Sequence, residues 1–168
     1  HALAYFGIKV SDREELKCFI GPPLLESFMK YYGLSREKAE VAVSVYRERY
    51  FETGWREASV ISGAEALLSA LSSGGKTVAL ATSKPEDISK RIIDFFNLTR
   101  YFDFIGGSEL SGPRHNKIDV INYVLENLGN PDKSKTVIIG DRHHDIDGAK
   151  EAGISSIGFT GGFGGREE

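Results

Sequence analysis

The chain has 168 residues, of which 40% are hydrophobic and 27% charged, with a net charge of −3. This composition is ordinary for a globular protein, lacks the basic character of a nucleic-acid binder, and includes no apolar run long enough to span a membrane. Cys18 is the single cysteine and cannot form an internal disulfide, which favours a reducing compartment and predicts a cytoplasmic protein.

The first 57 residues are predicted to be helical. Pro22 and Pro23 are suited to the start of a helix, Gly33 to its end, and Ser35 to the cap of the next helix. Two further stretches have the form of capping boxes, SDRE at 11–14 and SGAE at 62–65, and the second predicts a helix that reaches about Leu71.

After Gly54 the pattern becomes an alternation of short strands and helices. Strands are predicted at 77–82, 101–107, 136–141 and 155–160, and helices at about 84–96, 117–128 and 144–152. The runs TVALAT and TVIIGD are continuously apolar, which predicts strands buried on both faces. The chain is therefore predicted to be an α/β protein. It would combine a doubly wound parallel (Rossmann-like) sheet, with helices on both faces (58–168), and a separate helical domain (1–57).

The strand at 77–82 runs directly into a predicted helix. Ser83 and Glu86 are predicted to form a capping box at the start of that helix. Because ligands bind at the carboxyl ends of parallel strands, the free N–H groups there would suit a phosphate. The alternative is an ordinary strand-to-helix turn with a good cap.

Three charged residues follow the same edge of the predicted sheet. Lys117 stands at the start of a helix, where the helix dipole disfavours a cation, so a phosphate or a carboxylate is the expected partner. Asp141 and Asp145 lie four residues apart in GDRHHD, and two carboxylates after a buried strand suit Mg²⁺. The alternatives are a solvated lysine and an Asp turn followed by a helix-start acid. His143 and His144 are interpreted as loop residues, because the few, scattered histidines disfavour zinc.

These segments together resemble the haloacid dehalogenase superfamily, in its phosphoglycolate-phosphatase-like branch with a helical cap. ATSKP at 81–85 is similar to the second motif of that family, Lys117 to the third, and GDRHHD at 140–145 to the fourth. IGPPLLESF at 20–28 and YRERY at 46–50 resemble cap sequences of the branch.

The resemblance implies a role for each matching residue. Thr82 would hydrogen-bond the transferring phosphoryl group, Lys117 would neutralise charge, and Asp141 would bind Mg²⁺. Asp145 would support the metal through water or orient Lys117. These roles agree with phosphoryl transfer as a reaction driven by positioning and charge stabilisation. Substrate contacts are predicted for Ser83, Lys84 and Arg47.

The chain departs from the family pattern at the first motif. That motif is DxDG at the end of a central first strand, and it supplies the nucleophilic Asp and the general acid/base. The letters DIDG occur at 145–148, but they follow no strand of their own. We therefore expect an upstream segment that brings the missing Asp residues and a strand between those ending at Thr82 and Asp141.

The resemblance implies a Mg²⁺-dependent phosphomonoester hydrolase that forms an aspartyl-phosphate on the upstream Asp. Its substrate would be a small phosphorylated metabolite such as phosphoglycolate, and it would act as a monomer or homodimer without nucleic acid or membrane. The alternatives are a 5′-nucleotidase of the same superfamily and a non-catalytic phosphate- and Mg²⁺-binding module. A receiver or dinucleotide-binding domain is disfavoured, because no GxGxxG follows a strand and the helical segment is long.

Overall fold

The computed structural model describes residues 1–20, 22–164 and 167, and the chain divides into two compact units, residues 1–58 and 59–168. The predicted roles of the two parts, a helical cap and an α/β core, stay predictions. None of the helices in the described part of the chain is long and apolar enough to cross a membrane. The cytoplasmic location stays a prediction.

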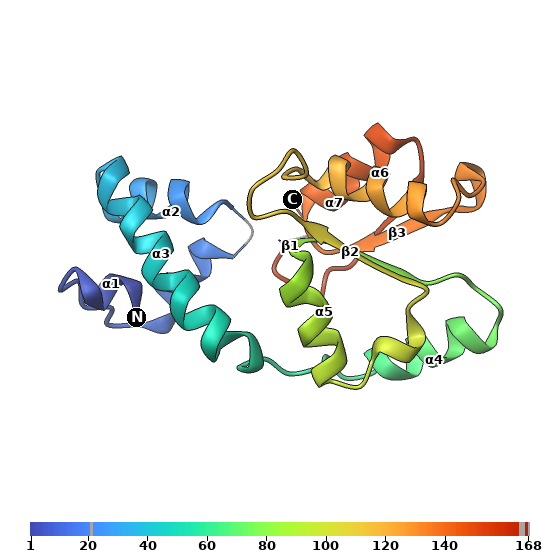
Figure 1. Cartoon of the computed structure of the whole chain (residues 1–168), viewed down its shortest axis with the longest axis horizontal. Coiled ribbons are helices and arrows are strands. Elements are labelled where there is room, and N and C mark those ends of the chain that lie inside the picture. The colour runs from blue at the N-terminus through green and yellow to red at the C-terminus, as the bar shows by residue number, and fades with distance from the viewer. Residues whose placement is uncertain (21, 165–166, 168) are drawn as a thin grey trace. The chain divides into compact units, whose positions relative to one another are not determined.

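The first unit is made of helices (Figure 1). In chain order these are α1 (Ala2–Tyr5), the 3₁₀ helix η1 (Arg13–Phe19), α2 (Leu24–Tyr32), α3 (Arg36–Glu52) and η2 (Gly54–Arg56). The α1, α2 and α3 helices share an apolar core in which Leu3, Phe28, Ala39 and Ala42 are buried. The small alanines allow α1 and α2 to pack closely against α3.

Some predicted helix ends are confirmed and others are wrong. Gly33 ends α2 in the left-handed region, at φ 61°, and the Ser35 hydroxyl caps α3 by accepting from the Lys38 N–H at 3.4 Å. At the predicted box 11–14, Asp12 replaces Ser11 as the cap and accepts from the Glu14 N–H at 2.9 Å. At 62–65, Gly63 precedes the helix at φ 85° and no side chain caps it, because the backbone turns there in a conformation that suits glycine.

The second unit alternates helices and parallel strands. Its elements are α4 (Ala64–Ser73), β1 (Ala79–Pro85), α5 (Glu86–Phe95), η3 (Thr99–Tyr101), β2 (Phe104–Ser108), α6 (Lys117–Asn127), η4 (Lys133–Lys135), β3 (Val137–Gly140), α7 (His143–Ala152) and β4 (Ser155–Gly158). Helices α6 and α7 lie on one side of the strands, and α4 and α5 lie on the other (Figure 1). The predicted α/β fold with a parallel sheet and helices on both faces is confirmed.

The described strands form two separate parallel pairs, β1 with β2 and β3 with β4. One layer of helices serves both pairs, because Ile121 and Leu125 of α6 form a core cluster that includes Ala81 of β1 and Ile138 of β3. No described strand pairs β1 with β3. The strand that we expect between them stays a prediction.

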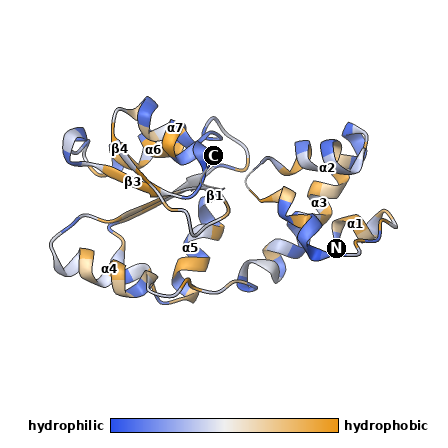
Figure 2. Cartoon of the chain, turned by 180° about the vertical axis from the view of Figure 1, so that it is seen from behind, coloured by the Kyte–Doolittle hydropathy of each residue, from blue (hydrophilic) through white to orange (hydrophobic). Residues whose placement is uncertain are grey.

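The prediction that TVIIGD is buried on both faces is wrong for β3. Ile138 packs into the core cluster, but Val137 is 49% exposed and Ile139 is 53% exposed. Helix α7 packs against both β3 and β4. Figure 2 shows hydrophobic residues along β3 and along α4.

A glycine allows α5 to begin directly beside β2. Gly107 is the register partner of Thr82, and a Cβ added at Gly107 would lie 2.6 Å from the Lys84 carbonyl oxygen and 2.7 Å from the Glu86 nitrogen. Those are backbone atoms, which cannot move aside as a flexible side chain does. The close approach of β2 to the β1–α5 turn therefore requires glycine.

We predict that Gly107→Ala lowers the free energy of unfolding by about 1–3 kcal/mol, because the new methyl group overpacks the turn. Gly158→Ala is the matched control, since Gly158 also lies in a strand but a Cβ there would meet only Ile146 Cδ1 at 4.0 Å. Its expected effect is within about 0.5 kcal/mol. Urea unfolding of both variants measures the difference, and equal midpoints would contradict the packing argument.

Candidate functional site

Lys117 joins three segments of the second unit at one point. Its ammonium group donates to the Ala81 carbonyl oxygen of β1 at 3.0 Å and lies 2.7 Å from Asp145 Oδ1 of α7. The side chain of Lys117 is 14% exposed and that of Asp145 is 11% exposed. The expected partner of this cation at a helix start is therefore a carboxylate, and the pair is mostly shielded from water.

The turn after β1 is irregular at the residues predicted to bind phosphate. The pairing with β2 shifts between Thr82 and Pro85, so Ser83 and Lys84 lie in a bulge. Bulges of this kind are frequent next to active sites. The Thr82 hydroxyl accepts from the Lys84 N–H at 3.2 Å, and the Ser83 carbonyl accepts from the Ser108 hydroxyl at 2.8 Å.

The predicted capping box of Ser83 and Glu86 is wrong. Residues 83–85 still belong to β1, and α5 begins at Glu86 with no side-chain cap. The Glu86 carboxylate instead accepts from the Lys90 ammonium at 2.6 Å and from the Gly107 N–H at 3.3 Å. The first N–H groups of α5 are thus left without a capping side chain.

The protein shifts the pKa values of Lys84 and Glu86, which lie at the turn after β1. Nearby protein atoms desolvate the Lys84 ammonium group, and this lowers the pKa of Lys84. Burial acts to raise the pKa of Glu86, but hydrogen bonds from Lys90 and the Gly107 N–H outweigh it, so the pKa is lowered overall. Glu86 is therefore an anion at neutral pH.

The two aspartates of GDRHHD have different surroundings. Both oxygens of Asp145 are engaged, Oδ1 with Lys117 and Oδ2 with the Arg142 N–H at 3.1 Å. Asp141 Oδ2 accepts from the Phe163 N–H at 2.7 Å. Gly140 is required before Asp141, because a Cβ there would overlap the Asp145 side chain. His143 and His144 begin α7, so their interpretation as loop residues is wrong.

Three residues around this site were missed from the sequence. Arg114 lies in the loop before α6, and its Nε donates to the Gly107 carbonyl at 2.7 Å. Gly148 lies in α7 where a Cβ would stand 2.9 Å from Lys117 Cγ, so it makes room for the lysine stem. Phe163 contributes only its backbone N–H. The signals were the paired glycines within β2 and a glycine inside a helix, which mark close approaches.

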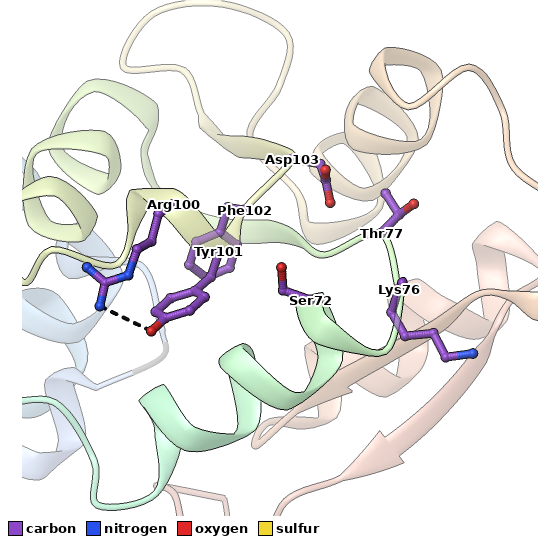
Figure 3. Close-up of a pocket in the computed structure, with 8 residues that line it drawn as sticks. Ser72, Lys76, Thr77, Arg100, Tyr101, Phe102 and Asp103 are labelled. Carbon is purple, nitrogen blue, oxygen red and sulfur yellow. Dashed lines mark hydrogen bonds between the residues drawn. The ribbon is translucent and has the colours of Figure 1, made fainter.

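A hollow of the second unit lies elsewhere. It has a volume of about 310 Å³ and is lined by residues 72, 75–77 and 100–103 (Figure 3). These residues precede β1 and β2, so the hollow is at the amino ends of the strands. The predicted site residues follow the strands, at the opposite edge. The charged groups that converge on Lys117 do not line this hollow.

A comparison with protein families agrees with this arrangement. Residues 1–159 match the family described as haloacid dehalogenase-like hydrolase. The chain belongs to that family.

Relatives of known name cover the whole of this haloacid dehalogenase-like chain. A 5′-nucleotidase of Pseudomonas aeruginosa is 42% identical over 99% of the chain and 75% of the nucleotidase. The crystal structure of a protein named as a predicted phosphatase of Clostridium acetobutylicum has 45% identity and a TM-score of 0.89, over 99% of this chain and 77% of that one.

Two other relatives show the range of names in the family. A phosphoglycolate phosphatase of Aquifex aeolicus is 34% identical over 70% of the chain and 54% of the phosphatase. The tyrosine-protein kinase PtkA of Mycobacterium tuberculosis is 36% identical over 98% of the chain, which spans 55% of the kinase. The recognition of the family and the assignment as a phosphatase of that family are confirmed by these matches.

The residues present fit a hard divalent cation that is bound by only one or two protein ligands. Within residues 1–20, 22–164 and 167, no group of three or more His, Cys, Asp or Glu could hold a metal. Mg²⁺ commonly takes one or two carboxylates and completes its coordination with water and phosphate oxygens. Asp141 is the better candidate for direct contact, because Asp145 already uses both oxygens. Asp145 fits a residue that orients Lys117.

Arg47 belongs to the first unit, where it is exposed on α3. Its predicted contact with substrate stays a prediction. The same holds for the catalytic and binding roles of the residues that converge in the second unit.

We predict that Asp145→Ala lowers the free energy of unfolding by about 3–5 kcal/mol, because it leaves Lys117 as a shielded charge without its counter-ion. The control is Asp147→Ala, which removes an exposed carboxylate from the same helix and should change stability by less than about 0.5 kcal/mol. Chemical unfolding at neutral pH measures both. The double variant Lys117→Met/Asp145→Leu should recover most of the loss, and a loss as large as that of Asp145→Ala would contradict the buried-pair argument.

Proposed function

We propose that this chain forms the phosphate- and Mg²⁺-binding part of a phosphomonoesterase that acts on a small phosphorylated metabolite. The observation that carries the proposal is the position of Lys117, held between the Ala81 carbonyl and Asp145 beside the end of β1. A fixed ammonium group beside Thr82 and the uncapped start of α5 is suited to the oxygens of a phosphoryl group.

Each of the site residues has a separate role in this proposal. The Thr82 hydroxyl and the first N–H groups of α5 donate hydrogen bonds to phosphoryl oxygens, and Lys117 offsets their negative charge. Asp145 holds the Lys117 ammonium group in place through the 2.7 Å contact. Asp141 would bind Mg²⁺, which when bound offsets repulsion between an anionic nucleophile and an anionic substrate. The nucleophilic Asp belongs to the expected upstream segment.

The substrate class follows from the relatives and from the predicted cap. The relative with 42% identity is named a 5′-nucleotidase, which favours a nucleoside monophosphate over phosphoglycolate as the first substrate to test. In this proposal the helical first unit is the cap that selects the substrate, with Arg47 and Lys84 at the far end of the molecule bound. The proposed protein is a cytoplasmic monomer or homodimer without nucleic-acid or membrane partners.

The first experiment uses the 168-residue chain and inorganic phosphate. We expect calorimetry to detect phosphate binding that strengthens when Mg²⁺ is added, and Lys117→Met to weaken it by roughly tenfold or more, because a charge-assisted contact is lost. Lys76→Met is the control, since Lys76 is exposed at the opposite edge of the strands. Phosphate binding that ignores both Mg²⁺ and the Lys117 substitution would refute the proposal.

The second experiment tests hydrolysis and the choice of substrate. We expect the chain, once fused to the segments of the P. aeruginosa nucleotidase that flank the matched region, to release phosphate from nucleoside monophosphates with Mg²⁺. Arg47→Ala and Lys84→Ala should each raise KM by roughly tenfold, and Arg36→Ala on the same helix as Arg47 should not. A fusion that is folded, binds phosphate and hydrolyses no ester would favour the alternative of a non-catalytic binding module.

A further inference from the structure

Arg114 contacts three separate segments of the second unit. Its Nε donates to the Gly107 carbonyl of β2 at 2.7 Å, and its Nη2 donates to Glu86 of α5 at 3.3 Å. The guanidinium carbon lies 3.7 Å from the centre of the Tyr123 ring of α6. One side chain thus ties together β2, α5 and α6.

These contacts are protected from water. The side chains of Arg114 and Glu86 are only 15% and 16% exposed. A shielded ion pair that also hydrogen-bonds the backbone and stacks on an aromatic ring has a well-defined geometry, because each contact restricts the planar guanidinium group in a different direction. This distinguishes the Arg114–Glu86 pair from a surface salt bridge, which holds its partners weakly.

The Arg114–Glu86 pair also contacts β2 beside the turn between β1 and α5. Glu86 accepts from the Gly107 N–H while Arg114 donates to the Gly107 carbonyl, so both backbone polar groups of Gly107 are engaged. Gly107 is in register with Thr82 across the β1–β2 pair. The first residue of α5, Glu86, is therefore held against the neighbouring strand β2.

Arg114 also anchors the loop that leads to Lys117. The loop that precedes α6 closes on itself, because the Glu109 N–H donates to the Arg114 carbonyl at 3.0 Å and the Arg114 N–H donates to Glu109 Oε2 at 3.4 Å. Three residues later Lys117 begins α6. A loop anchored at Arg114 leaves little freedom for the backbone that carries the lysine.

We propose that Arg114, paired with Glu86, is a positioning residue that sets Lys117 and the Thr82 turn in the geometry for binding a phosphoryl group. This inference rests on the proposed function of the site. Arg114 does not itself contact the phosphate in this proposal. Its effect passes through Gly107 to the β1 turn and through the loop to the start of α6.

The test measures two properties of the 168-residue chain. The first is the dissociation constant for inorganic phosphate with Mg²⁺. The second is the NMR signal of the Lys117 ammonium group, assigned by its absence in Lys117→Met, which reports whether the group stays held by Ala81 and Asp145. Both are measured well below the unfolding midpoint of each variant, so a general loss of stability does not enter.

We expect Arg114→Gln to weaken phosphate binding by roughly tenfold or more and to broaden or remove the Lys117 signal, because the charge and the bond to Gly107 are both lost. Arg114→Lys keeps the charge without the planar group and should fall between wild type and Arg114→Gln. Glu86→Gln should weaken phosphate binding less than Arg114→Gln. These two milder variants keep the test decisive if Arg114→Gln does not fold.

Arg100→Gln is the matched control. Arg100 also pairs with a glutamate, Glu65, at 2.7 Å and stacks on a tyrosine, Tyr101, at 4.7 Å, but it lies at the amino ends of the strands. Its substitution should leave the phosphate dissociation constant within about twofold and the Lys117 signal unchanged.

The proposal would be overturned if Arg114→Gln or Arg114→Lys folds with wild-type phosphate affinity and an unchanged Lys117 signal. Failure of the proposed function looks different: the wild-type chain would then bind no phosphate, while the Lys117 signal would still show whether Arg114 positions the lysine.

Discussion

The site depends on a lysine placed where a helix disfavours a cation. Lys117 opens α6, and the partial positive charge of a helix start opposes its ammonium group. Asp145 of α7 and the Ala81 carbonyl of β1 offset this cost at 2.7 Å and 3.0 Å. A shielded ion pair is a poor source of net stability, because desolvation offsets most of the Coulomb attraction. Its value here is to hold one charge at a defined point between separate segments.

Glycines allow the backbone segments around this site to approach one another closely. Gly148 lets α7 pass close to the Lys117 stem, and Gly140 lets the chain turn beside Asp145. Gly107 permits the same closeness between β2 and the β1–α5 turn. Glycine loses more backbone entropy on folding than other residues, so its use at these three close contacts indicates that close approach outweighs local stability there. A methyl group at any of these positions would separate the segments that bring the charges together.

Much of this was readable from the sequence, and the errors have physical causes. Short apolar runs that alternate with helical segments predicted the α/β fold. Lys117, Asp141 and Asp145 were indicated by their positions after strands or at a helix start. The Ser83–Glu86 capping box was wrong because a bulge keeps residues 83–85 in the strand and a tertiary contact with Gly107 attracts Glu86. Local patterns do not reveal such long-range competition for a side chain.

The β3–β4 pair shows a different limit of sequence reading. An apolar run predicts burial on both faces, yet Val137 and Ile139 remain about half exposed while Ile138 packs into the core cluster. Arg114 was missed for a related reason, since a basic residue in a loop reads as a solvated charge until its contacts with Gly107, Glu86 and Tyr123 are known. Both cases depend on what stands across a tertiary contact. The charges at the strand ends are informative from the sequence because topology alone brings them together, whereas the residues that hold them in place are visible only once the contacts are drawn.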